Sequence, residues 1–310
     1  MNISTNAKLQ DYSNFGLGGI ASKIITLSTS DELINALSSL EQNKEPYKIL
    51  AGGTNVVFPD EGLTETLIHI KGGNIEINNT DLGLTADSGV LLMDVVKKAL
   101  RLGWVGMENL SGIPGTIGGA VYGNAGAYGT ELKDLVDEVE IFDQGKRKWL
   151  SNTDCQFGYR TSVFKNHLRS DLKLIILKVK LKLAGRGDAN ELKNKSQEII
   201  QIREQKYSPE LKCPGSYFKN LLVSELTTEQ LQSIPKDKIM FGKIPAGYLL
   251  EEVDAKSKSV GDIKVADFHA NLLYNAGNGT AKQARELAEI LKQLVLGKFG
   301  IRLEEEVRYF

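Results

Sequence analysis

The amino-acid sequence predicts an α+β fold that is divided into two or three lobes. Apolar residues recur with a helical period in some segments and alternate as in half-buried strands in others. A glycine-rich stretch at residues 104–129 interrupts these elements, and the composition shifts at residues 207–209. With 310 residues, the chain is long enough to bury a sizeable core in more than one lobe.

The composition is that of an ordinary soluble globular protein, because hydrophobic residues make up 41% and charged residues 25% of the chain. The formal net charge is −1 and no long run of like charge occurs, so the sequence predicts no nucleic-acid partner. No apolar run reaches the length of a membrane span, and residues 1–14 lack the apolar segment of a secretory signal. We therefore expect a cytoplasmic protein without a membrane partner.

The cysteines and histidines predict no metal site. Cys155 and Cys213 match no metal-ligand spacing, and the three histidines are scattered without an HExxH pattern. Because disulfides are rare in the cytoplasm, we expect both cysteines to be reduced, with a disulfide between them as the alternative.

The first helix has the clearest boundary signals. Thr29 and Glu32 have the spacing of a capping box and an apolar face follows, so we expect a helix that ends near Asn43. Strands flank this helix on both sides, the first within residues 14–29 after a glycine turn and the second, buried, at residues 47–50.

The later elements follow from the same two periods. Residues 66–71 alternate as a half-buried strand, and residues 91–102 predict an amphipathic helix that stops at Gly103. Antiparallel strands are expected around a turn at residues 143–145, and residues 177–183 alternate apolar residues with lysine. The remaining expected elements are a polar helix over 189–206, a short helix near 226–233, a turn at 245–247, a helix from Thr280 to Gly297 and a strand-like C-terminus.

The stretch at residues 104–129 reads WVGMENLSGIPGTIGGAVYGNAGAYG and has no period long enough for an ordinary element. A flexible linker is the plain alternative, but linkers are rich in serine, proline and charge, whereas apolar residues such as Ile117 and Val121 separate these glycines. The stretch therefore predicts a folded, buried loop whose backbone approaches an anion, usually a phosphate. Gly52–Asn55 follow a buried strand and predict a second loop of this kind, for which a plain turn is the alternative.

Arg160 and Ser216 lie in sequence contexts that a surface loop does not need. Arg160, in GYRTSVFK just before a strand, can hold a carboxylate through two parallel hydrogen bonds, unless it forms a surface salt bridge. Ser216, in PGSYFKN, has no GxSxG elbow around it. Its hydroxyl can therefore serve as a proton donor rather than a nucleophile, with an ordinary turn serine as the alternative.

Two further groups lie near the C-terminus. Glu306, in LEEEVR, shares one strand face with Glu304, although a solvated acidic terminus has the same pattern. His269 and Asn271, in ADFHAN, share one strand face, where a structural histidine is the commoner outcome.

Together these blocks resemble the UDP-N-acetylenolpyruvoylglucosamine reductase family. The resemblance runs from about residue 11 to the C-terminus, through AGGTN, SGIPGTIGGAVYGNAGAYG, GYRTSVFK, PGSYFKN, ADFHANLLYN and LEEEVR in the family's order. The long glycine loop alone would support only the wider vanillyl-alcohol-oxidase class of FAD-binding domains. The sequence departs from the family at Thr54, where serine is expected, and at Leu221, which replaces a proline. The absence of an insertion after GYRTSVFK indicates the shorter, type II-like form.

The resemblance implies a two-lobed FAD-binding PCMH-type domain and a C-terminal α+β substrate-binding lobe. The implied limits are residues 1–70 and 71–206 for the FAD-binding lobes, 207–300 for the substrate-binding lobe and 301–310 for a strand that returns to the active site. It also implies non-covalent FAD, NADPH as the reductant, UDP-N-acetylglucosamine enolpyruvate as the substrate, and a monomer.

The resemblance assigns roles to three residues. Hydride passes from flavin N5 to C3 of the enolpyruvyl group, Arg160 grips the substrate carboxylate, Ser216 protonates C2, and Glu306 lies beside the carboxylate. The implied FAD contacts are Gly52, Gly53, Thr54, Asn55, Ser111, Gly112, Pro114, Gly115, Thr116, Gly118, Gly119, Asn124, Ala125, Gly126 and Tyr128. The implied substrate contacts are Tyr159, Lys219, Asn220, His269 and Asn271.

Two other functions explain part of the sequence. Another FAD-dependent oxidoreductase of this fold, acting on a sugar or alcohol, would explain the glycine loops but not Arg160, Ser216 and Glu306 together. A nucleotide-sugar- or flavin-binding protein without turnover would also explain the glycine loops but not Arg160, Ser216 and Glu306 together. A Rossmann dehydrogenase is disfavoured, because no GxGxxG motif opens a helix in a βαβ unit.

Overall fold

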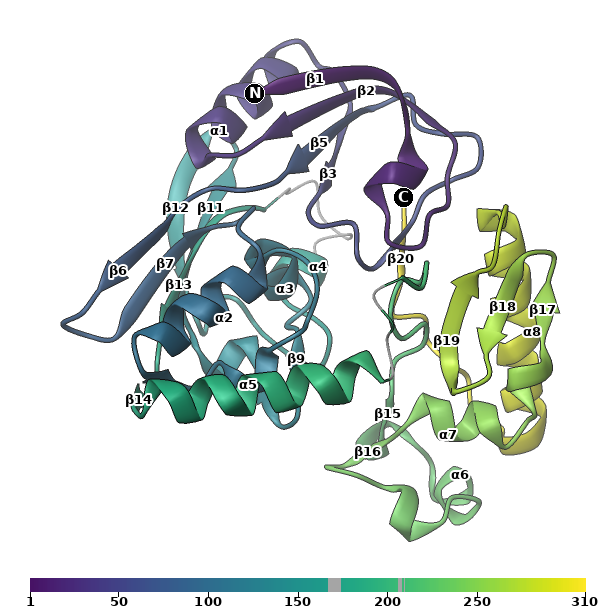
Figure 1. The fold of residues 1–310 in the computed structure, drawn as a ribbon. Helices are drawn as coiled ribbons and strands as arrows, with labels where there is room; N and C mark the ends of the chain where they lie inside the picture. The colour runs from purple at the N-terminus through teal and green to yellow at the C-terminus, as the bar shows by residue number, and fades with distance from the viewer. Residues whose placement is uncertain (167–173, 206–207, 209) are drawn as a thin grey trace. The chain divides into compact units, whose positions relative to one another are not determined.

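The computed structural model describes residues 1–166, 174–205, 208 and 210–310 (Figure 1). The chain forms two compact units. Unit 1 comprises Met1–Ala7, Ala21–Gly52 and Thr64–Gln205, and unit 2 comprises Lys8–Ile20, Gly53–Leu63 and Lys206–Phe310. The lobe limits implied by the sequence stay a prediction, and the limit at residues 206 and 207 lies outside the described residues.

The first sheet, most of which belongs to unit 1, has the strand order β1-β2-β5-β3. β2 and β3 both pair in parallel with β5, and α1 follows β2 in the chain. These elements are β1 (Asn2–Lys8), β2 (Ile20–Leu27), α1 (Ser30–Gln42), β3 (Tyr47–Leu50) and β5 (Thr66–Ile70). The predicted capping box is confirmed, since Thr29 caps α1 through the Glu32 amide and the helix ends at Asn43.

A strand forms at residues 66–70, as predicted, but the expectation that it is half-buried is wrong. β5 lies between two parallel neighbours, and four of its five residues are buried. Parallel strands in the middle of a sheet are covered on both faces, so their side chains do not divide into a wet and a dry set.

Half-buried His69 on β5 makes the stability of the fold depend on pH. Burial, and then the charge of Lys71, lower the pKa of His69 from 6.5 to about 4. Between these two pH values the unfolded chain binds a proton that the folded chain does not bind, so the free energy of unfolding falls as the pH falls. At about pH 5 we expect His69 to cost up to roughly 2 kcal/mol relative to neutral pH.

Urea unfolding of the parent and of His69→Gln at both pH values measures this effect. The variant should lose less stability than the parent on acidification, because the other titrating groups are common to both proteins. Equal losses would show that His69 is not the group responsible.

The second sheet of unit 1 is antiparallel, with the order β12-β11-β13-β7-β6. Its strands are β6 (Ile75–Asn78), β7 (Gly83–Asp87), β11 (Val136–Asp143), β12 (Lys146–Ser151) and β13 (Ile175–Lys182). The helices α2 (Leu92–Arg101) and α3 (Ile117–Tyr122) pack on it, and α5 (Ala189–Glu204) packs beside α2 (Figure 1). The predicted hairpin around residues 143–145 and the predicted helices over 91–102 and 189–206 are thereby confirmed in their described parts.

The glycine-rich stretch is folded and buried, as predicted, and belongs to unit 1. Trp104, Leu110 and Val121 have no exposed surface. The expectation that it holds no regular element is wrong, because it contains the six-residue helix α3. Thr116 caps α3 by accepting a hydrogen bond from the Gly119 amide at 3.2 Å. A helix of this length gives no readable period in the sequence.

Unit 2 is built on a three-stranded antiparallel sheet, β17-β18-β19, and α7 and α8 pack on it (Figure 1). Its apolar core includes Leu249, Leu273 and Leu287, none of which is exposed. The elements are β4 (Val56–Val57), β15 (Leu221–Leu222), α6 (Thr228–Gln232), β16 (Lys243–Ile244), α7 (Ala246–Glu251), β17 (Ser259–Val260), β18 (Ile263–Ala266), β19 (His269–Asn275), α8 (Ala281–Phe299) and β20 (Arg308–Tyr309).

Two predicted boundaries in unit 2 are wrong. Gly297 lies inside α8, and Gly300, with φ of +65°, ends the helix. A Cβ at Gly297 would meet nothing within 4 Å, so the packing around this position does not require a glycine. The predicted turn at residues 245–247 is the start of α7, where Pro245 is the N-cap. Throughout the described ranges, every helix is too short or too polar to cross a bilayer.

Candidate functional site

Parts of the two predicted glycine loops touch each other inside unit 1. A Cβ on Gly52 would lie 2.8 Å from the Gly115 Cα, and a Cβ on Gly119 would lie 3.2 Å from the Ala51 Cβ. These separations leave no room for a side chain at Gly52. The backbone of residues 51–52 therefore lies directly against the backbone of the long loop, which fits the prediction of two apposed loops.

Polar side chains hold the rest of the long loop in place. The hydroxyls of Ser111 and Ser196 are 2.8 Å apart and buried, which ties the loop to α5. Asn124 is 1% exposed, and its side-chain nitrogen donates to Gly158 O at 2.9 Å and to Glu131 at 3.0 Å. Its side-chain oxygen accepts from the Lys133 amide at 3.0 Å. The Asn124 side chain therefore supports the loop, and its implied contact with FAD stays a prediction.

The other half of the short loop, residues 53–55, belongs to unit 2. Gly53 has φ of +64°, and a Cβ there would collide with the Tyr12 carbonyl oxygen, so only glycine fits. Asn55 Nδ2 donates to Glu306 O at 3.1 Å. Asn55 Oδ1 is buried without a hydrogen-bond partner among the described residues. A buried acceptor of this kind fits a ligand that brings an N–H or O–H donor, as FAD does.

Arg160 lies beside the long loop in unit 1. It occupies a tight turn closed by Gly158 and Thr161, whose amides donate to each other's carbonyl oxygens at 3.1 and 3.3 Å. Its φ is +52°, a strained value for a non-glycine residue that is typical of functional sites. Arg160 Nη2 donates to Gly126 O at 3.3 Å, and its Cζ lies 5.8 Å from the centre of the Tyr159 ring. The expectation that a strand follows directly is wrong, since α4 (Val163–Asn166) comes next.

Ser216 lies beside β19 in unit 2, where it forms a β-bridge with Leu272. Asn271 fixes the residues that follow: its Oδ1 accepts from the Phe218 amide at 2.9 Å, and its Nδ2 donates to Phe218 O at 2.8 Å. The Asn271 side chain is 2% exposed. It therefore holds the backbone beside Ser216, while its implied substrate contact and that of the half-buried His269 stay predictions.

Glu306 lies on the segment that pairs with the Ser216 segment. The Glu306 amide donates to Tyr217 O at 2.8 Å, and Phe218 forms a bridge with Glu305. The two segments run antiparallel, so the structure brings the regions of Ser216 and Glu306 together within unit 2. Lys219 forms an ion pair with Glu304.

Asn220 connects this region to α7, since its Oδ1 accepts from the Ala246 amide at 3.1 Å. Sequence reasoning missed Arg203 on α5, whose Cδ would lie 3.2 Å from a Cβ on Gly112. It also missed the contact between Tyr217 and Tyr309, whose hydroxyls are 2.6 Å apart. No local pattern in the sequence marks Arg203 or this pair of tyrosines.

Since the resemblance implies that Gly52 and Gly115 contact FAD, we expect their close packing to make FAD affinity sensitive to one methyl group. Gly52→Ala would place a Cβ 2.8 Å from the Gly115 Cα and force the two backbones apart. Overpacking of this kind costs about 1–3 kcal/mol, so we expect the Kd for FAD to rise roughly 10- to 100-fold. Quenching of flavin fluorescence on binding measures the Kd.

Gly123→Ala is the matched control, because a Cβ there would meet only the Gly119 carbonyl oxygen, at 3.9 Å. It should bind FAD like the parent. An unchanged Kd in Gly52→Ala would mean that this contact does not shape the cofactor site.

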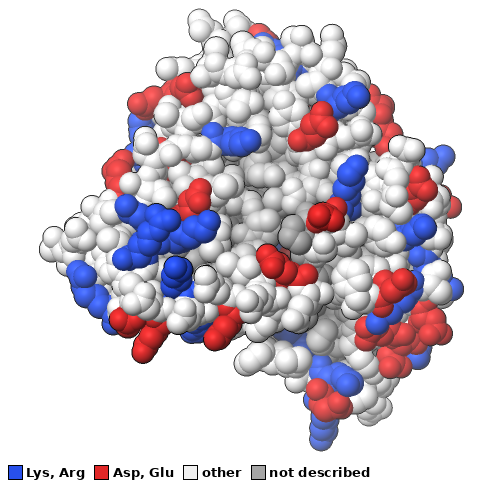
Figure 2. Space-filling model, viewed as in Figure 1, with Lys and Arg blue, Asp and Glu red and all other residues white. Residues whose placement is uncertain are grey.

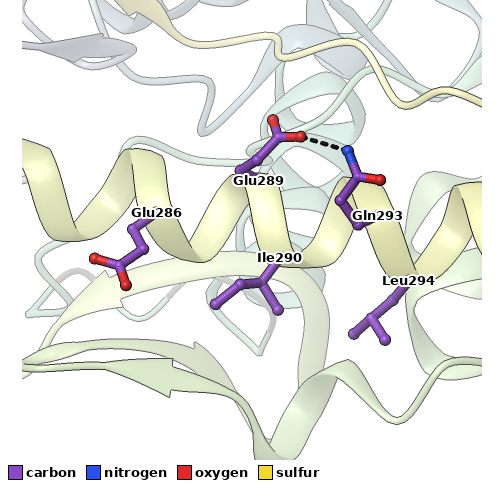
Figure 3. Close-up of a pocket in the computed structure, with 5 residues that line it drawn as sticks. All are labelled: Glu286, Glu289, Ile290, Gln293 and Leu294. Carbon is purple, nitrogen blue, oxygen red and sulfur yellow. Dashed lines mark hydrogen bonds between the residues drawn. The ribbon is translucent and has the colours of Figure 1, made fainter.

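Charged side chains and a pocket on α8 are two features of the described surface that do not carry the predicted chemistry. Figure 2 shows basic and acidic side chains interspersed over the face in view, in keeping with the net charge of −1. A pocket on α8 carries none of the predicted site residues, and a hydrogen bond of 2.6 Å joins two of the residues that line it (Figure 3). The pocket is lined by Glu286, Glu289, Ile290, Gln293 and Leu294. No group of three His, Cys, Asp or Glu that could hold a metal occurs in the part of the chain that the structure describes.

Comparisons with known proteins agree with this geometry. Residues 21–150 match the model of an FAD binding domain, and residues 205–310 match that of the UDP-N-acetylenolpyruvoylglucosamine reductase C-terminal domain. The chain is 36% identical to the UDP-N-acetylenolpyruvoylglucosamine reductase of Solibacter usitatus, over 99% of this chain and 96% of that protein. It is 31% identical to the UDP-N-acetylenolpyruvoylglucosamine reductase of Caldanaerobacter subterraneus, over 98% of this chain and 92% of that protein.

A solved structure is also similar. The crystal structure of UDP-N-acetylenolpyruvylglucosamine reductase (MurB) from Thermus caldophilus matches with a TM-score of 0.75 and 30% identity, over 100% of this chain and 98% of that chain. The predicted α+β class, with an FAD-binding PCMH-type domain and a separate C-terminal domain, is confirmed.

Proposed function

Because the chain belongs to the UDP-N-acetylenolpyruvoylglucosamine reductase family, we propose that it reduces UDP-N-acetylglucosamine enolpyruvate to UDP-N-acetylmuramate, with FAD as cofactor and NADPH as reductant. This reaction belongs to peptidoglycan precursor synthesis. The observation that carries the proposal is the backbone pairing of the Ser216 and Glu306 segments, in a chain whose Arg160 occupies a strained turn beside the glycine-rich loop.

The residues present fit FAD. Gly52 and the long loop of unit 1 offer backbone without side chains, which suits a diphosphate. The buried Asn55 Oδ1 offers an acceptor to an N–H or O–H group. When bound, FAD accepts a hydride from NADPH and delivers it to C3 of the enolpyruvyl group. No histidine lies in either glycine loop, so we propose that FAD is bound non-covalently.

Arg160 and Ser216 contribute to the reduction in different ways. The Arg160 guanidinium holds the substrate carboxylate by two hydrogen bonds and stabilises the negative charge that reaches this carboxylate as the hydride adds to C3. The Ser216 hydroxyl gives its proton to C2, so that one hydride and one proton complete the reduction of the double bond.

Glu306 lies on the segment opposite Ser216, where its carboxyl group assists at the substrate carboxylate. Tyr159, Lys219 and Asn220 contact the rest of the substrate in this proposal. The strained φ of Arg160, which is typical of functional sites, and the hydrogen bond that fixes the Asn220 side chain support the proposal.

A visible spectrum of the purified protein tests the proposal. Flavin bands should bleach when NADPH is added under anaerobic conditions and return when the enolpyruvyl substrate is added. Bands that return with a sugar or alcohol oxidation product, and not with the enolpyruvyl substrate, would favour the other oxidoreductase. A protein that binds no flavin even after addition of FAD would contradict both the proposed reductase and the other FAD-dependent oxidoreductase. The monomeric state and the cytoplasmic location stay predictions, which light scattering and cell fractionation would test.

A further inference from the structure

A hydrogen-bonded pair of tyrosine hydroxyls connects the segments that carry Ser216 and Glu306. The hydroxyls of Tyr217 and Tyr309 lie 2.6 Å apart, and the Tyr217 side chain has no exposed surface. Tyr217 directly follows Ser216 in the chain. Tyr309 follows Glu306 by three positions. The side-chain pair therefore reinforces the backbone hydrogen bond from Glu306 N to Tyr217 O, which is 2.8 Å long.

Helix α8 holds the terminal segment from another direction. The Arg285 Cζ lies 3.7 Å from the centre of the Tyr309 ring, within the range of a cation–π contact. About two turns further along α8, Lys292 forms an ion pair of 2.8 Å with Glu305. Glu306 is thus flanked by two residues, Glu305 and Tyr309, that α8 contacts directly.

The two hydroxyls are neutral at physiological pH. Burial raises the pKa of Tyr309 to about 12, and burial raises the pKa of Tyr217 well above its usual range. One hydroxyl therefore donates to the other, and this bond satisfies the fully buried Tyr217 hydroxyl, while Tyr309 also bonds to Glu305. Two phenylalanines would fill nearly the same volume without this directional bond.

We propose that Tyr309 is a positioning residue: its hydrogen bond to Tyr217 sets the spacing between the Ser216 hydroxyl and the Glu306 carboxyl. This inference rests on the proposed function and adds a residue to it. The backbone pairing of the two segments is short. A small displacement of a reacting group is enough to slow a reaction, so a further bond between the two segments affects the rate.

The alternative explanation is that the two hydroxyls form this hydrogen bond only to stabilise the fold. Physical chemistry separates the two explanations. Removing the Tyr309 hydroxyl leaves the fully buried Tyr217 hydroxyl without this partner, which destabilises the fold, whereas removing both hydroxyls can be nearly neutral. A purely structural pair therefore predicts that activity recovers together with stability in the double variant. A positioning pair predicts that stability recovers and activity does not.

The experiment compares Tyr309→Phe, Tyr217→Phe and the double variant with the parent. Tyr274→Phe, a half-buried tyrosine on β19, is the matched control. Three quantities are measured on FAD-loaded protein: the urea midpoint, the rate of flavin reduction by NADPH, and the single-turnover rate of flavin reoxidation by the enolpyruvyl substrate. Only the last step uses Ser216 and Glu306.

Tyr309→Phe should unfold at lower urea than the parent, because it leaves the buried Tyr217 hydroxyl without this partner, and the double variant should recover most of that shift. Reoxidation by the substrate should fall about tenfold or more in both single variants and in the double variant. Flavin reduction by NADPH should stay within about twofold of the parent. Tyr274→Phe should match the parent in all three quantities.

A double variant that reoxidises at the parent rate would overturn the inference and leave the pair a structural one. Equal losses in both half-reactions would also overturn it, since positioning of Ser216 and Glu306 affects only one of them. A parent protein that the substrate does not reoxidise would overturn the proposed function itself, before any variant is compared.

Discussion

Ser216→Ala is expected to lower the rate of reduction of the enolpyruvyl substrate by about 10³-fold, within the range of roughly 10² to 10⁴ for the loss of a general acid. In the proposed function, the variant lacks the proton that completes the reduction at C2. FAD binding and flavin reduction by NADPH should be unchanged, because Ser216 lies beside β19 in unit 2 and is proposed to act only on the substrate. Stopped-flow absorbance of the flavin measures the two half-reactions separately.

Ser224→Ala is the matched control, since Ser224 is exposed in the same unit. It should reduce the substrate at the parent rate. If Ser216→Ala also kept the parent rate, the proton would come from elsewhere. Loss of flavin reduction by NADPH in Ser216→Ala would assign this residue to the other half-reaction.

Arg160→Lys is expected to lower kcat/KM for the substrate by about 10²- to 10³-fold, although the positive charge is kept. Lysine cannot make two parallel hydrogen bonds to a carboxylate, and its ammonium group is a single point of charge. Since the charge on this carboxylate grows as the hydride is added, most of the loss should appear in kcat rather than KM. Steady-state kinetics with saturating NADPH separates the two.

Arg186→Lys on β14 (Gly185–Arg186) is the control, because Arg186 is an exposed arginine of unit 1 outside the proposed site. Its kinetics should match the parent. An effect of Arg160→Lys on KM alone would indicate that Arg160 binds substrate and transition state equally, and would contradict the proposed role.

The elements that the sequence predicts well are those with local signals. A signal of only a few neighbouring residues predicts each of them, as for the capping box of Thr29 and Glu32, the hairpin of β11 and β12, and the helix start at Thr280. Predictions failed where neighbours in space decide the outcome. β5 is buried because two parallel strands enclose it, and α3 forms because the Thr116 cap and close glycine packing support a very short helix.

The candidate site divides in the same way. The motifs indicate Arg160, Ser216 and Glu306 individually, and the resemblance supplies their roles, which stay proposals. The support around them is not readable in the sequence. Tyr217 and Tyr309 are 92 positions apart, and Asn55 meets Glu306 across 251 positions, so no periodicity or motif links them.

The parallel pairing of β20 with β4 has a consequence for biosynthesis. β20 ends one residue before Phe310, and its partner β4 lies near the other end of the chain. Unit 1 is complete once Gln205 has been made, whereas unit 2 needs the last residues of the chain. Since domains fold as they leave the ribosome, unit 1 can fold during translation while unit 2 still waits for the segment that carries β20, so we expect unit 1 to fold first.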